Sequence, residues 1–422
     1  MDRLVVTGGA RLAGSVHISG AKNSALKVMA ASLLAPGRSR LHNVPRIIDC
    51  SIMGEVLEHL GAGVEWGNGG VSVDATHLSS VEAPYELVRR MRASIVVLGP
   101  LLARTGEARV AMPGGDNIGS RPIDLHLEGL RRMGATIESE HGFLVAAADG
   151  LTGASITLDY PSVGATENLM MAAVGADGTT VIDNAAREPE IADLARFLGS
   201  MGATIRGAGS ATIQIQGVSS LEPAEHTVIP DRIEAGTWAA AAVATRGDVR
   251  LLGARPDHLE LVLEKLGESG ASISVSDDGL RVTQPDRPRA VDFVTLPYPG
   301  LATDFQPILL AMLATASGTS IATENVFEGR FTYVDELRRM AADIRTEGHH
   351  AVIRGVEQLS AAPVRALDIR AGAAMAIAAL TADGITEIAN IQHVDRGYED
   401  FDAKLTALGA EVRRESELVR LP

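Results

Sequence analysis

The chain has 422 residues, of which 46% are apolar and 22% charged, a balance typical of folded globular proteins and a length too great for one hydrophobic core. Aromatic residues are only 3%, which argues against stacking platforms for single-stranded nucleic acid. The net charge of −15, from 38 Lys and Arg against 53 Asp and Glu, repels nucleic acid and anionic membranes. An anionic ligand must therefore be held by a local cluster of basic residues.

The first residues indicate a strand and no export signal. Met1-Asp2-Arg3 leads directly into an apolar Leu-Val-Val run, without the charged segment and long apolar stretch of a signal peptide. The longest apolar runs, such as 371–380, are shorter than the ~20 residues that span a bilayer. The single cysteine, Cys50, excludes a disulfide framework and a cysteine-based zinc site. We therefore expect a cytoplasmic protein.

An internal repeat is the strongest architectural signal. A helix-like segment that ends in Gly-Ala recurs about every 70 residues, which divides the chain into six units. A sixth, degenerate copy reads Met340-Ala341-Ala342. The glycines of the five intact copies are Gly61, Gly134, Gly202, Gly270 and Gly409.

Each unit has the same predicted elements. The fourth unit contains an amphipathic helix over 256–266, and the glycine that follows supplies the positive φ that ends a helix. Strands over 272–275 and 280–283 then form a hairpin. The helices over 236–245 and 371–380 carry alanine on every face, which predicts that they are buried at the centre of a domain. The predicted fold class is α/β, with six βαβαββ-like repeats, three in each of two domains.

The domain boundary is predicted at 228–232, between the third and fourth units and near the middle of the chain. The opening strand is left over before the first alanine-rich helix, at 24–34. We therefore expect an N-terminal domain over 22–229 and a C-terminal domain over 1–21 plus 230–422, connected by two strands.

Two glycine-containing polar segments do not follow the repeat. Residues 19–24 place Lys22 and Asn23 at the start of a buried helix, where the helix dipole favours an anion, although a solvated lysine in a turn is the local alternative. Residues 113–126 are glycine-rich and contain Asp116 and Arg121. Within this second segment, residues 113–121 are either a mobile lid that closes on an anion or an exposed hairpin.

Further charged residues lie at the junctions between units. Asp304 precedes a helix, where a capping role is the local alternative, and Arg370 and Arg396 each follow an aspartate closely, as structural ion pairs would. In an acidic protein, however, basic residues that recur at these junctions can converge. Together with Lys22, Arg92 and Arg121, they predict one anion pocket between the two domains.

Several long motifs resemble those of one enzyme family. The segments S-G-A-K-N-S (19–24), P-G-G-D-x-I-G-S-R-P-I-D-L-H (113–126), P-S-V-G-A-T-E-N (161–168) and H-V-D-R-G-Y-E (393–399) are similar to the UDP-N-acetylglucosamine 1-carboxyvinyltransferases, which are enolpyruvyl transferases. The resemblance runs from residue 3 to about 414. It implies a two-domain inverse α/β barrel with its active site in the interdomain cleft.

The resemblance also implies a reaction. The enolpyruvyl group of phosphoenolpyruvate moves to the 3′-hydroxyl of UDP-N-acetylglucosamine, by addition through a tetrahedral ketal and then elimination of phosphate. This is the first committed step of peptidoglycan precursor synthesis. It needs no metal and no cofactor, and its partners are the two small-molecule substrates, not nucleic acid or membrane. The oligomeric state is left open.

Residue roles follow from the same resemblance. Lys22, Arg121 and Arg396 would hold the phosphate and carboxylate of phosphoenolpyruvate, with Arg370 nearby. Asp304 would accept the proton of the hydroxyl, and Asp116 would supply the proton that C3 needs. Arg330 and Asp368 match further positions in the family's cleft. The residues expected to hold the UDP-sugar are Asn23, Arg92, Arg121, Pro122, Ile123, Asp124, Leu125, Pro161, Ser162, Val163, Gly164 and Val326.

The chain departs from the common family pattern at three positions. Asp116 stands where most members have a lid cysteine, and Ile48 and Tyr160 stand where lysines are frequent. Three alternatives to the main interpretation are the sister enolpyruvylshikimate-phosphate synthase, a paralogue that acts on another sugar nucleotide, and a non-catalytic UDP-sugar sensor. The presence of both Asp116 and Asp304 disfavours the sensor.

Overall fold

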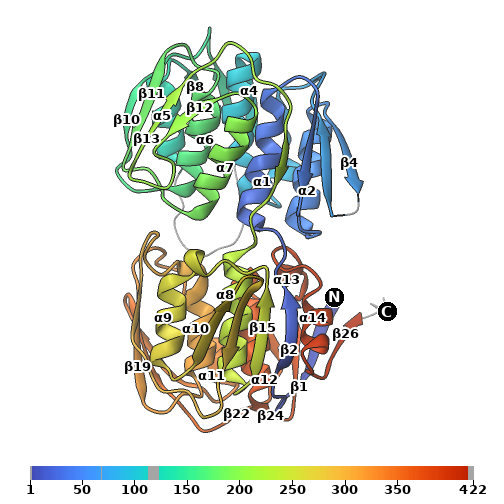
Figure 1. The fold of residues 1–422 in the computed structure, drawn as a ribbon, viewed down its shortest axis with the longest axis vertical. Coiled ribbons are helices and arrows are strands. Elements are labelled where there is room, and N and C mark those ends of the chain that lie inside the picture. Colours follow the sequence, from blue (N-terminus) through green and yellow to red (C-terminus); the bar gives the residue numbers. More distant parts are fainter. Residues whose placement is uncertain (1, 68, 113–122, 417–422) are drawn as a thin grey trace. The chain divides into compact units, whose positions relative to one another are not determined.

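A computed structural model describes residues 2–67, 69–112 and 123–416 of the chain. These residues form two compact units (Figure 1). The N-terminal unit lies within residues 20–229, and the C-terminal unit combines residues 2–19 with residues from 230 onward. Each unit has a hydrophobic core of its own.

The N-terminal unit contains three four-stranded sheets, ordered β14-β3-β5-β4, β6-β7-β9-β8 and β10-β11-β13-β12, among the residues described. In each sheet the first pair is parallel and the other two are antiparallel. The strands are β3 (Arg38–His42), β4 (Gly63–Gly67), β5 (Gly70–Asp74), β6 (Glu82–Ala83), β7 (Glu107–Ala111), β8 (Thr136–Glu140), β9 (Phe143–Ala147), β10 (Ser155–Thr157), β11 (Thr179–Asp183), β12 (Thr204–Arg206), β13 (Thr212–Gln216) and β14 (Glu225–Thr227). The helices are α1 (Lys22–Ala31), η1 (Ser32–Leu34), α2 (Ile48–His59), α3 (Tyr85–Val88), η2 (Arg92–Val97), α4 (Leu98–Thr105), α5 (Asp124–Arg132), α6 (Val163–Ala173) and α7 (Pro189–Ser200).

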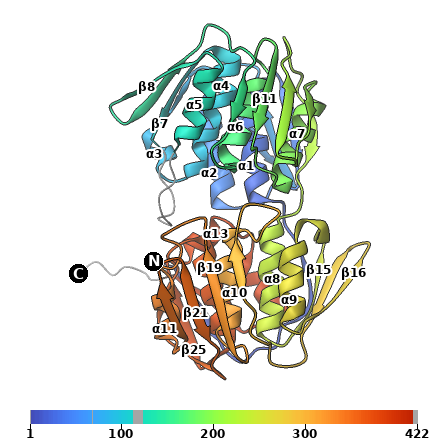
Figure 2. The same cartoon turned by 90° about the vertical axis from the view of Figure 1, so that its left-hand side faces the viewer.

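The C-terminal unit repeats this arrangement, with four-stranded sheets ordered β16-β17-β15-β2, β18-β19-β21-β20 and β23-β25-β1-β26 (Figure 2). A further pair joins β22 to β24. The strands are β1 (Asp2–Thr7), β2 (Ala13–His17), β15 (Asp248–Leu252), β16 (Ser272–Ser276), β17 (Gly279–Thr283), β18 (Phe293–Thr295), β19 (Thr319–Glu324), β20 (Asp343–Glu347), β21 (His350–Arg354), β22 (Leu359–Ser360), β23 (Val364–Arg365), β24 (Ala382–Asp383), β25 (Ile385–Ala389) and β26 (Val412–Ser416). The helices are α8 (Arg232–Ala244), η3 (Pro256–His258), α9 (Glu260–Glu268), η4 (Thr303–Phe305), α10 (Gln306–Leu313), α11 (Val334–Arg339), α12 (Ile369–Leu380), α13 (Gln392–Asp395) and α14 (Phe401–Ala407).

The alanine-rich helices are buried, as predicted. Every residue of α8 and of α12 is buried, and the two helices belong to the core of the C-terminal unit. Both begin earlier than predicted, at Arg232 and Ile369, because Asp231 and Asp368 cap their first turns with side-chain hydrogen bonds. An apolar pattern does not include such a polar first turn.

The repeat signal corresponds to one backbone conformation. The five glycines of the Gly-Ala pairs have φ between 92° and 110°. Ala341 of the degenerate copy has φ 64°, so the left-handed turn is kept there without glycine. The predicted helix over 256–266 differs from the structure, because Leu259 (φ −127°, ψ 6°) separates η3 from α9. The predicted α/β fold with six repeats is confirmed.

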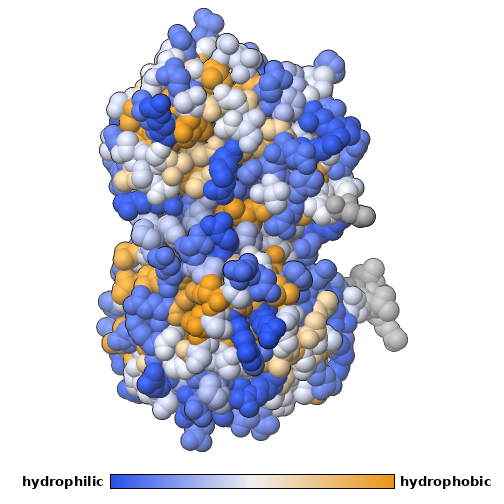
Figure 3. All heavy atoms as spheres, in the orientation of Figure 1, coloured by the Kyte–Doolittle hydropathy of each residue, from blue (hydrophilic) through white to orange (hydrophobic). Residues whose placement is uncertain are grey.

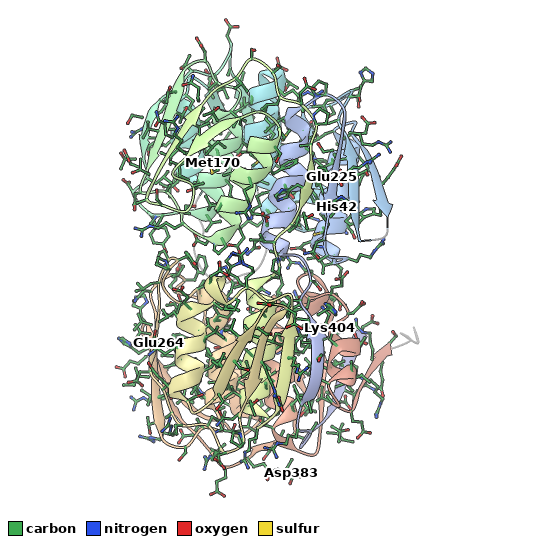
Figure 4. The ribbon with its side chains drawn as sticks, viewed as in Figure 1. His42, Met170, Glu225, Glu264, Asp383 and Lys404 are labelled. Atoms are coloured by element: carbon green, nitrogen blue, oxygen red, sulfur yellow. The ribbon has the colours of Figure 1, made fainter. Side chains whose placement is uncertain are left out.

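The N-terminal unit is inserted into the C-terminal unit along the chain. Strand β2 pairs in parallel with β15, and the residues between them in sequence include the entire N-terminal unit. Within the C-terminal unit, the Asp231 amide donates to the Ser19 carbonyl at 2.8 Å. Lys404 Nζ, labelled in Figure 4, donates to Ser19 Oγ at 2.7 Å and to Glu234 Oε1 at 2.6 Å. The two ends of the insertion therefore leave and re-enter this unit next to one another.

Hydrophilic side chains dominate the face seen in Figure 3, with apolar residues scattered among them. None of the helices in the described ranges is long and apolar enough to cross a membrane.

Candidate active site

The predicted site residues fall into one group in each unit. Lys22, Asn23, Arg92, Ile123, Asp124, Leu125 and the Pro161–Gly164 segment lie in the N-terminal unit, and Asp304, Val326, Arg330, Asp368, Arg370 and Arg396 lie in the C-terminal unit. Asp116, Arg121 and Pro122, with the predicted lid over 113–121, lie outside the described residues.

Two members of the C-terminal group, Asp304 and Arg370, lie at the starts of buried helices. Asp304 belongs to η4, directly before α10, and Arg370 is the second residue of α12. Asp304 Oδ1 accepts a hydrogen bond from Arg370 Nε at 2.8 Å. The arginine side chain is only 5% exposed, whereas that of the aspartate is 32% exposed. The carboxylate is thus held on its buried side and remains open to a ligand.

Nearby guanidinium groups control the ionisation of Asp304. Burial alone would raise its pKa, but the positive charges of Arg370 and Arg330 outweigh burial and hold the pKa well below its ordinary value. Burial lowers the pKa of Arg370, but Tyr398 and Asp304 outweigh it and the net shift is upward. Asp304 is therefore ionised at neutral pH and can accept a hydrogen bond or a proton.

The same group contains buried hydrogen-bond donors for which the described residues provide no acceptor. Arg330 is 4% exposed, and its Nε and Nη2 atoms have no partner among the described residues. Arg370 Nη1 and Gln306 Nε2 are also without an acceptor within that part of the chain. A buried donor without a partner costs about 1–3 kcal/mol. An arrangement of this kind is typical of a site that an anionic ligand completes.

The remaining predicted residues of this unit have different surroundings. Asp368 Oδ1 accepts from the amides of Arg370 and Ala371 at 2.8 and 2.9 Å, so its carboxylate caps α12 and fixes the start of the helix that carries Arg370. The Val326 amide donates to Glu324 Oε1 at 2.7 Å. Arg396 is partly buried at the end of α13.

The N-terminal group begins with a lysine that is held by an aspartate. Lys22 is 8% exposed, and its Nζ lies 2.8 Å from Asp49 Oδ2. One turn further along α1, Lys27 Nζ donates to the Asn23 carbonyl at 2.8 Å and lies 3.1 Å from Glu167 Oε2. Burial raises the pKa of Glu167 to about 7, although Lys27 opposes that shift. The first two turns of α1 are thus anchored by two buried ion pairs.

The expected UDP-sugar segments lie on neighbouring elements of this unit. Arg92 begins η2, Asp124 is the exposed first residue of α5, and Ser162 caps α6 by accepting from the Ala165 amide at 3.3 Å. A Cβ at Gly164 would lie 3.2 Å from His126 Cε1, so the first turn of α6 passes close to α5. Burial, with the charges of Arg92 and Lys27, lowers the pKa of His126 to about 4.

Sequence reasoning missed several members of both groups. Asp49, Lys27 and Glu167 pair across elements that are far apart in sequence, and no local motif indicates those pairs. Arg232 was visible at the start of a helix, and its charge helps to lower the pKa of Asp304. Within the described ranges, no three His, Cys, Asp or Glu side chains are placed to hold a metal ion.

The fold places the chain in the inverse α/β barrel class of transferases. A model of EPSP synthase (3-phosphoshikimate 1-carboxyvinyltransferase) matches residues 6–405, and the chain belongs to this family. A UDP-N-acetylglucosamine 1-carboxyvinyltransferase of Corynebacterium jeikeium is 55% identical over 98% of this chain and 99% of its own length. The transferase of the same name from Mycobacterium tuberculosis is 54% identical with the same coverage.

Solved structures agree with this assignment. The enolpyruvyl transferase NikO from Streptomyces tendae matches with a TM-score of 0.88 and 29% identity, over 98% of each chain. EPSP synthase from Acinetobacter baumannii shares the fold, with a TM-score of 0.78 and 19% identity over 99% of this chain and 100% of its own. The resemblance to UDP-N-acetylglucosamine 1-carboxyvinyltransferases is confirmed, and the chain is an enzyme of the transferase class.

Proposed function

We propose that this enzyme transfers the enolpyruvyl group of phosphoenolpyruvate to the 3′-hydroxyl of UDP-N-acetylglucosamine and releases phosphate. This reaction is the first committed step of peptidoglycan precursor synthesis. The observation that carries the proposal is the pairing of an ionised Asp304 with buried donors of Arg330 and Arg370 that have no acceptor among the described residues. A base and an anion site side by side are what this chemistry requires. We propose UDP-N-acetylglucosamine as the acceptor because relatives at 53–55% identity are named for it.

The steps follow from the chemistry of an enol ether. Asp304 accepts the proton of the 3′-hydroxyl while the hydroxyl oxygen forms a bond to C2 of phosphoenolpyruvate, and C3 receives a proton from Asp116. The tetrahedral product then returns a proton from C3 to the Asp116 carboxylate, the C3–H electron pair forms the C2–C3 double bond, and the C2–O bond breaks so that phosphate leaves with its electron pair. Fixed cations stabilise the phosphate and carboxylate in both steps.

Groups of both units serve this one reaction in the proposal. Lys22, Arg121, Arg370 and Arg396 bind phosphoenolpyruvate, and Lys22 is supported by its buried ion pair with Asp49. Arg330 adds donors to an anionic group of the substrates, and Asp368 acts through the start of α12. The UDP-sugar is bound by Asn23, Arg92, the 121–125 and 161–164 segments and Val326. Because both substrates are intracellular metabolites, we also propose a cytoplasmic location.

Phosphate release tests the proposal directly. Purified enzyme with phosphoenolpyruvate is given UDP-N-acetylglucosamine, shikimate 3-phosphate or UDP-glucose as the acceptor. We expect phosphate release only with UDP-N-acetylglucosamine, together with the mass of the enolpyruvyl product. Release with shikimate 3-phosphate or with UDP-glucose alone would assign another acceptor, and binding of UDP-N-acetylglucosamine without release would indicate a sensor.

A further inference from the structure

A buried asparagine joins three segments of the N-terminal unit. Asn168, on the second turn of α6, is fully buried. Its Oδ1 accepts from the Gly99 amide of α4 at 2.7 Å. Its Nδ2 lies 3.1 Å from His126 Nδ1 of α5 and 3.4 Å from the Ile95 carbonyl of η2. One amide group therefore contacts α4, α5 and η2 from α6.

These contacts leave one consistent assignment of protons. The Gly99 amide can only donate, so it must face the oxygen of Asn168, and the NH₂ group must face His126 and Ile95. His126 Nδ1 is then an acceptor, which requires a neutral ring with its proton on Nε2. The lowered pKa of His126, about 4, agrees with a neutral ring. The amide and the ring thus fix each other's orientation.

Close backbone packing keeps the amide in place. Gly99 lies in the first turn of α4, where backbone amides lack an acceptor within the helix, and Asn168 supplies one. A Cβ at Gly99 would lie 2.3 Å from the Asn168 carbonyl oxygen, so only glycine fits. On the opposite side, His126 occupies the space in front of Gly164. The contact between His126 and Gly164 therefore holds the first turn of α5 against the first turn of α6.

Two of the contacted elements, η2 and α5, and the helix α6 that carries Asn168 contain residues expected to bind the UDP-sugar. Arg92 begins η2, Asp124 and Leu125 begin α5, and Val163 and Gly164 begin α6. We propose that Asn168 is a positioning residue that sets these three segments for the UDP-sugar and fixes the tautomer of His126. It does not touch the reacting atoms. The inference rests on the proposed function for the identity of the ligand.

Three variants separate positioning from simple stability. Asn168→Leu keeps the branched shape and the number of side-chain heavy atoms and removes every side-chain hydrogen bond. Asn168→Asp keeps the acceptor for Gly99 but turns a second acceptor toward His126, so the ring must place a proton on Nδ1. Thr166→Val is the matched control: Thr166 is on the same helix, is fully buried, and its Oγ1 accepts from the Ala186 amide at 3.0 Å, away from His126.

The experiment measures KM for each substrate, kcat, calorimetric binding of UDP-N-acetylglucosamine, and ¹⁵N spectra of the histidine rings, with His126→Gln for assignment. We expect Asn168→Leu to raise KM and Kd for the UDP-sugar at least ~10-fold, with KM for phosphoenolpyruvate and kcat within ~3-fold. Thr166→Val lowers Tm without changing either KM. In Asn168→Asp the Nδ1 signal of His126 becomes that of a protonated nitrogen.

Other outcomes overturn the inference. A lower Tm with unchanged KM in Asn168→Leu would make Asn168 purely structural, as would an equal effect of Thr166→Val. An unchanged His126 signal in Asn168→Asp contradicts the tautomer assignment, and this variant decides the question if Asn168→Leu does not fold. Failure of the wild-type enzyme to release phosphate refutes the proposed function instead, so the two failures are distinguishable.

Discussion

Asp304 is a carboxylate whose chemistry depends on its neighbours. Its pKa lies below the ordinary value because Arg370 and Arg330 place positive charge beside it, despite its partial burial. An acceptor hydroxyl that enters this group meets an ionised oxygen and not a carboxylic acid. Loss of the negative charge would keep the shape of the side chain but remove both its ability to take a proton and its ion pair with Arg370.

We expect Asp304→Asn to reduce turnover by at least ~10²-fold, because the amide cannot accept the proton of the hydroxyl. Phosphate release under saturating substrates measures it, and circular dichroism verifies the fold. Asp335→Asn is the control, since Asp335 is an exposed residue of the same unit whose partner is Arg338 at 2.7 Å. Equal activity of the two variants would remove Asp304 from the base role.

Lys22→Ala should reduce turnover by a similar factor, at least ~10²-fold, because a fixed cation of the phosphate site is lost. Lys22→Arg, which keeps the charge, should retain more activity than Lys22→Ala in the same phosphate-release assay. Near-native turnover of Lys22→Ala would contradict the assignment.

Asp116 leads to a prediction that rests on the sequence alone. Fosfomycin inactivates members of this family by alkylating a lid cysteine, and a carboxylate opens an epoxide far less readily than a thiolate. Cys50 is a buried residue of α2 and offers no substitute. We expect the enzyme to be insensitive to the drug, and Asp116→Cys to become sensitive. A stable adduct on the native protein with loss of activity, seen by mass spectrometry, would refute this.

At the residue scale, the sequence motifs indicated which charged residues belong to the predicted site, but not the residues with which they form ion pairs. Asp304 and Arg370 were both expected near substrate, and the structure places them 2.8 Å apart. Asp49 and Glu167 were not expected, because a buried ion pair between two helices leaves no periodic pattern. Asn168 stands within a quoted motif, but only the contacts of its amide reveal that it connects three segments.

At the scale of elements, the contact between α1 and α6 carries a buried titratable pair. Glu167 has a pKa of about 7 in the folded protein, against an ordinary value of 4.5, so the folded state binds more protons than the unfolded state between these values. Stability from this group is present below pH 4.5 and is lost as the pH rises through 7.

We therefore expect the wild-type protein to lose free energy of unfolding relative to Glu167→Gln between pH 4.5 and 7, by at most about 1.4 kcal/mol per pH unit. Urea unfolding of both proteins at pH 5, 6, 7 and 8 measures the difference. A difference that does not change with pH would mean that Glu167 titrates at its ordinary value when folded.

The degenerate repeat offers a second test at this scale. Ala341 is exposed and has φ 64°, a conformation that costs an L residue roughly 1–2 kcal/mol and glycine much less. Ala341→Gly should stabilise the protein by about 0.5–1 kcal/mol in urea unfolding, after the entropic cost of glycine. Ala342→Gly, at the buried neighbour, should destabilise it. A loss of stability in Ala341→Gly would show that the turn is not strained.

The repeat could be predicted from the sequence because the helix end of every copy needs a residue with positive φ. Glycine occupies that position in five of the six copies. Helix starts were placed less well, since Asp231 and Asp368 act through hydrogen bonds that an apolar pattern does not contain. The pairing of β14 with β3 joins residues 185 positions apart, and the sequence of such short strands does not indicate which strand they pair with.

At the scale of the whole molecule, the sequence of the C-terminal unit is interrupted by the N-terminal unit. Contacts within the C-terminal unit hold the two ends of the interruption together. The Ser19 carbonyl and the Asp231 amide are 2.8 Å apart, so a short linker can replace everything between them. Strand β1 pairs on both sides, with β25 and β26, and β2 extends the sheet of β15. The core of this unit includes Leu4 and Leu12 from these opening residues.

We expect a chain that joins 1–19 to 230–422 through two or three glycines to fold cooperatively, and residues 20–229 to fold separately. Urea unfolding followed by circular dichroism measures both. The matched control is 230–422 without 1–19, which lacks β1 and β2 and should not fold. A folded control would show that the opening strands are dispensable.

Strand β1 is synthesised long before the two strands with which it pairs. Its partners β25 and β26 span 385–416, so at ~5–20 residues per second β1 is translated roughly 20–80 seconds before them. Residues 20–229 can complete their own core in that interval, whereas Leu4 and Val6, fully buried at the end, remain without their sheet. The sheet of β1 therefore closes only after β25 and β26 have been translated, and the C-terminal unit cannot be completed before then.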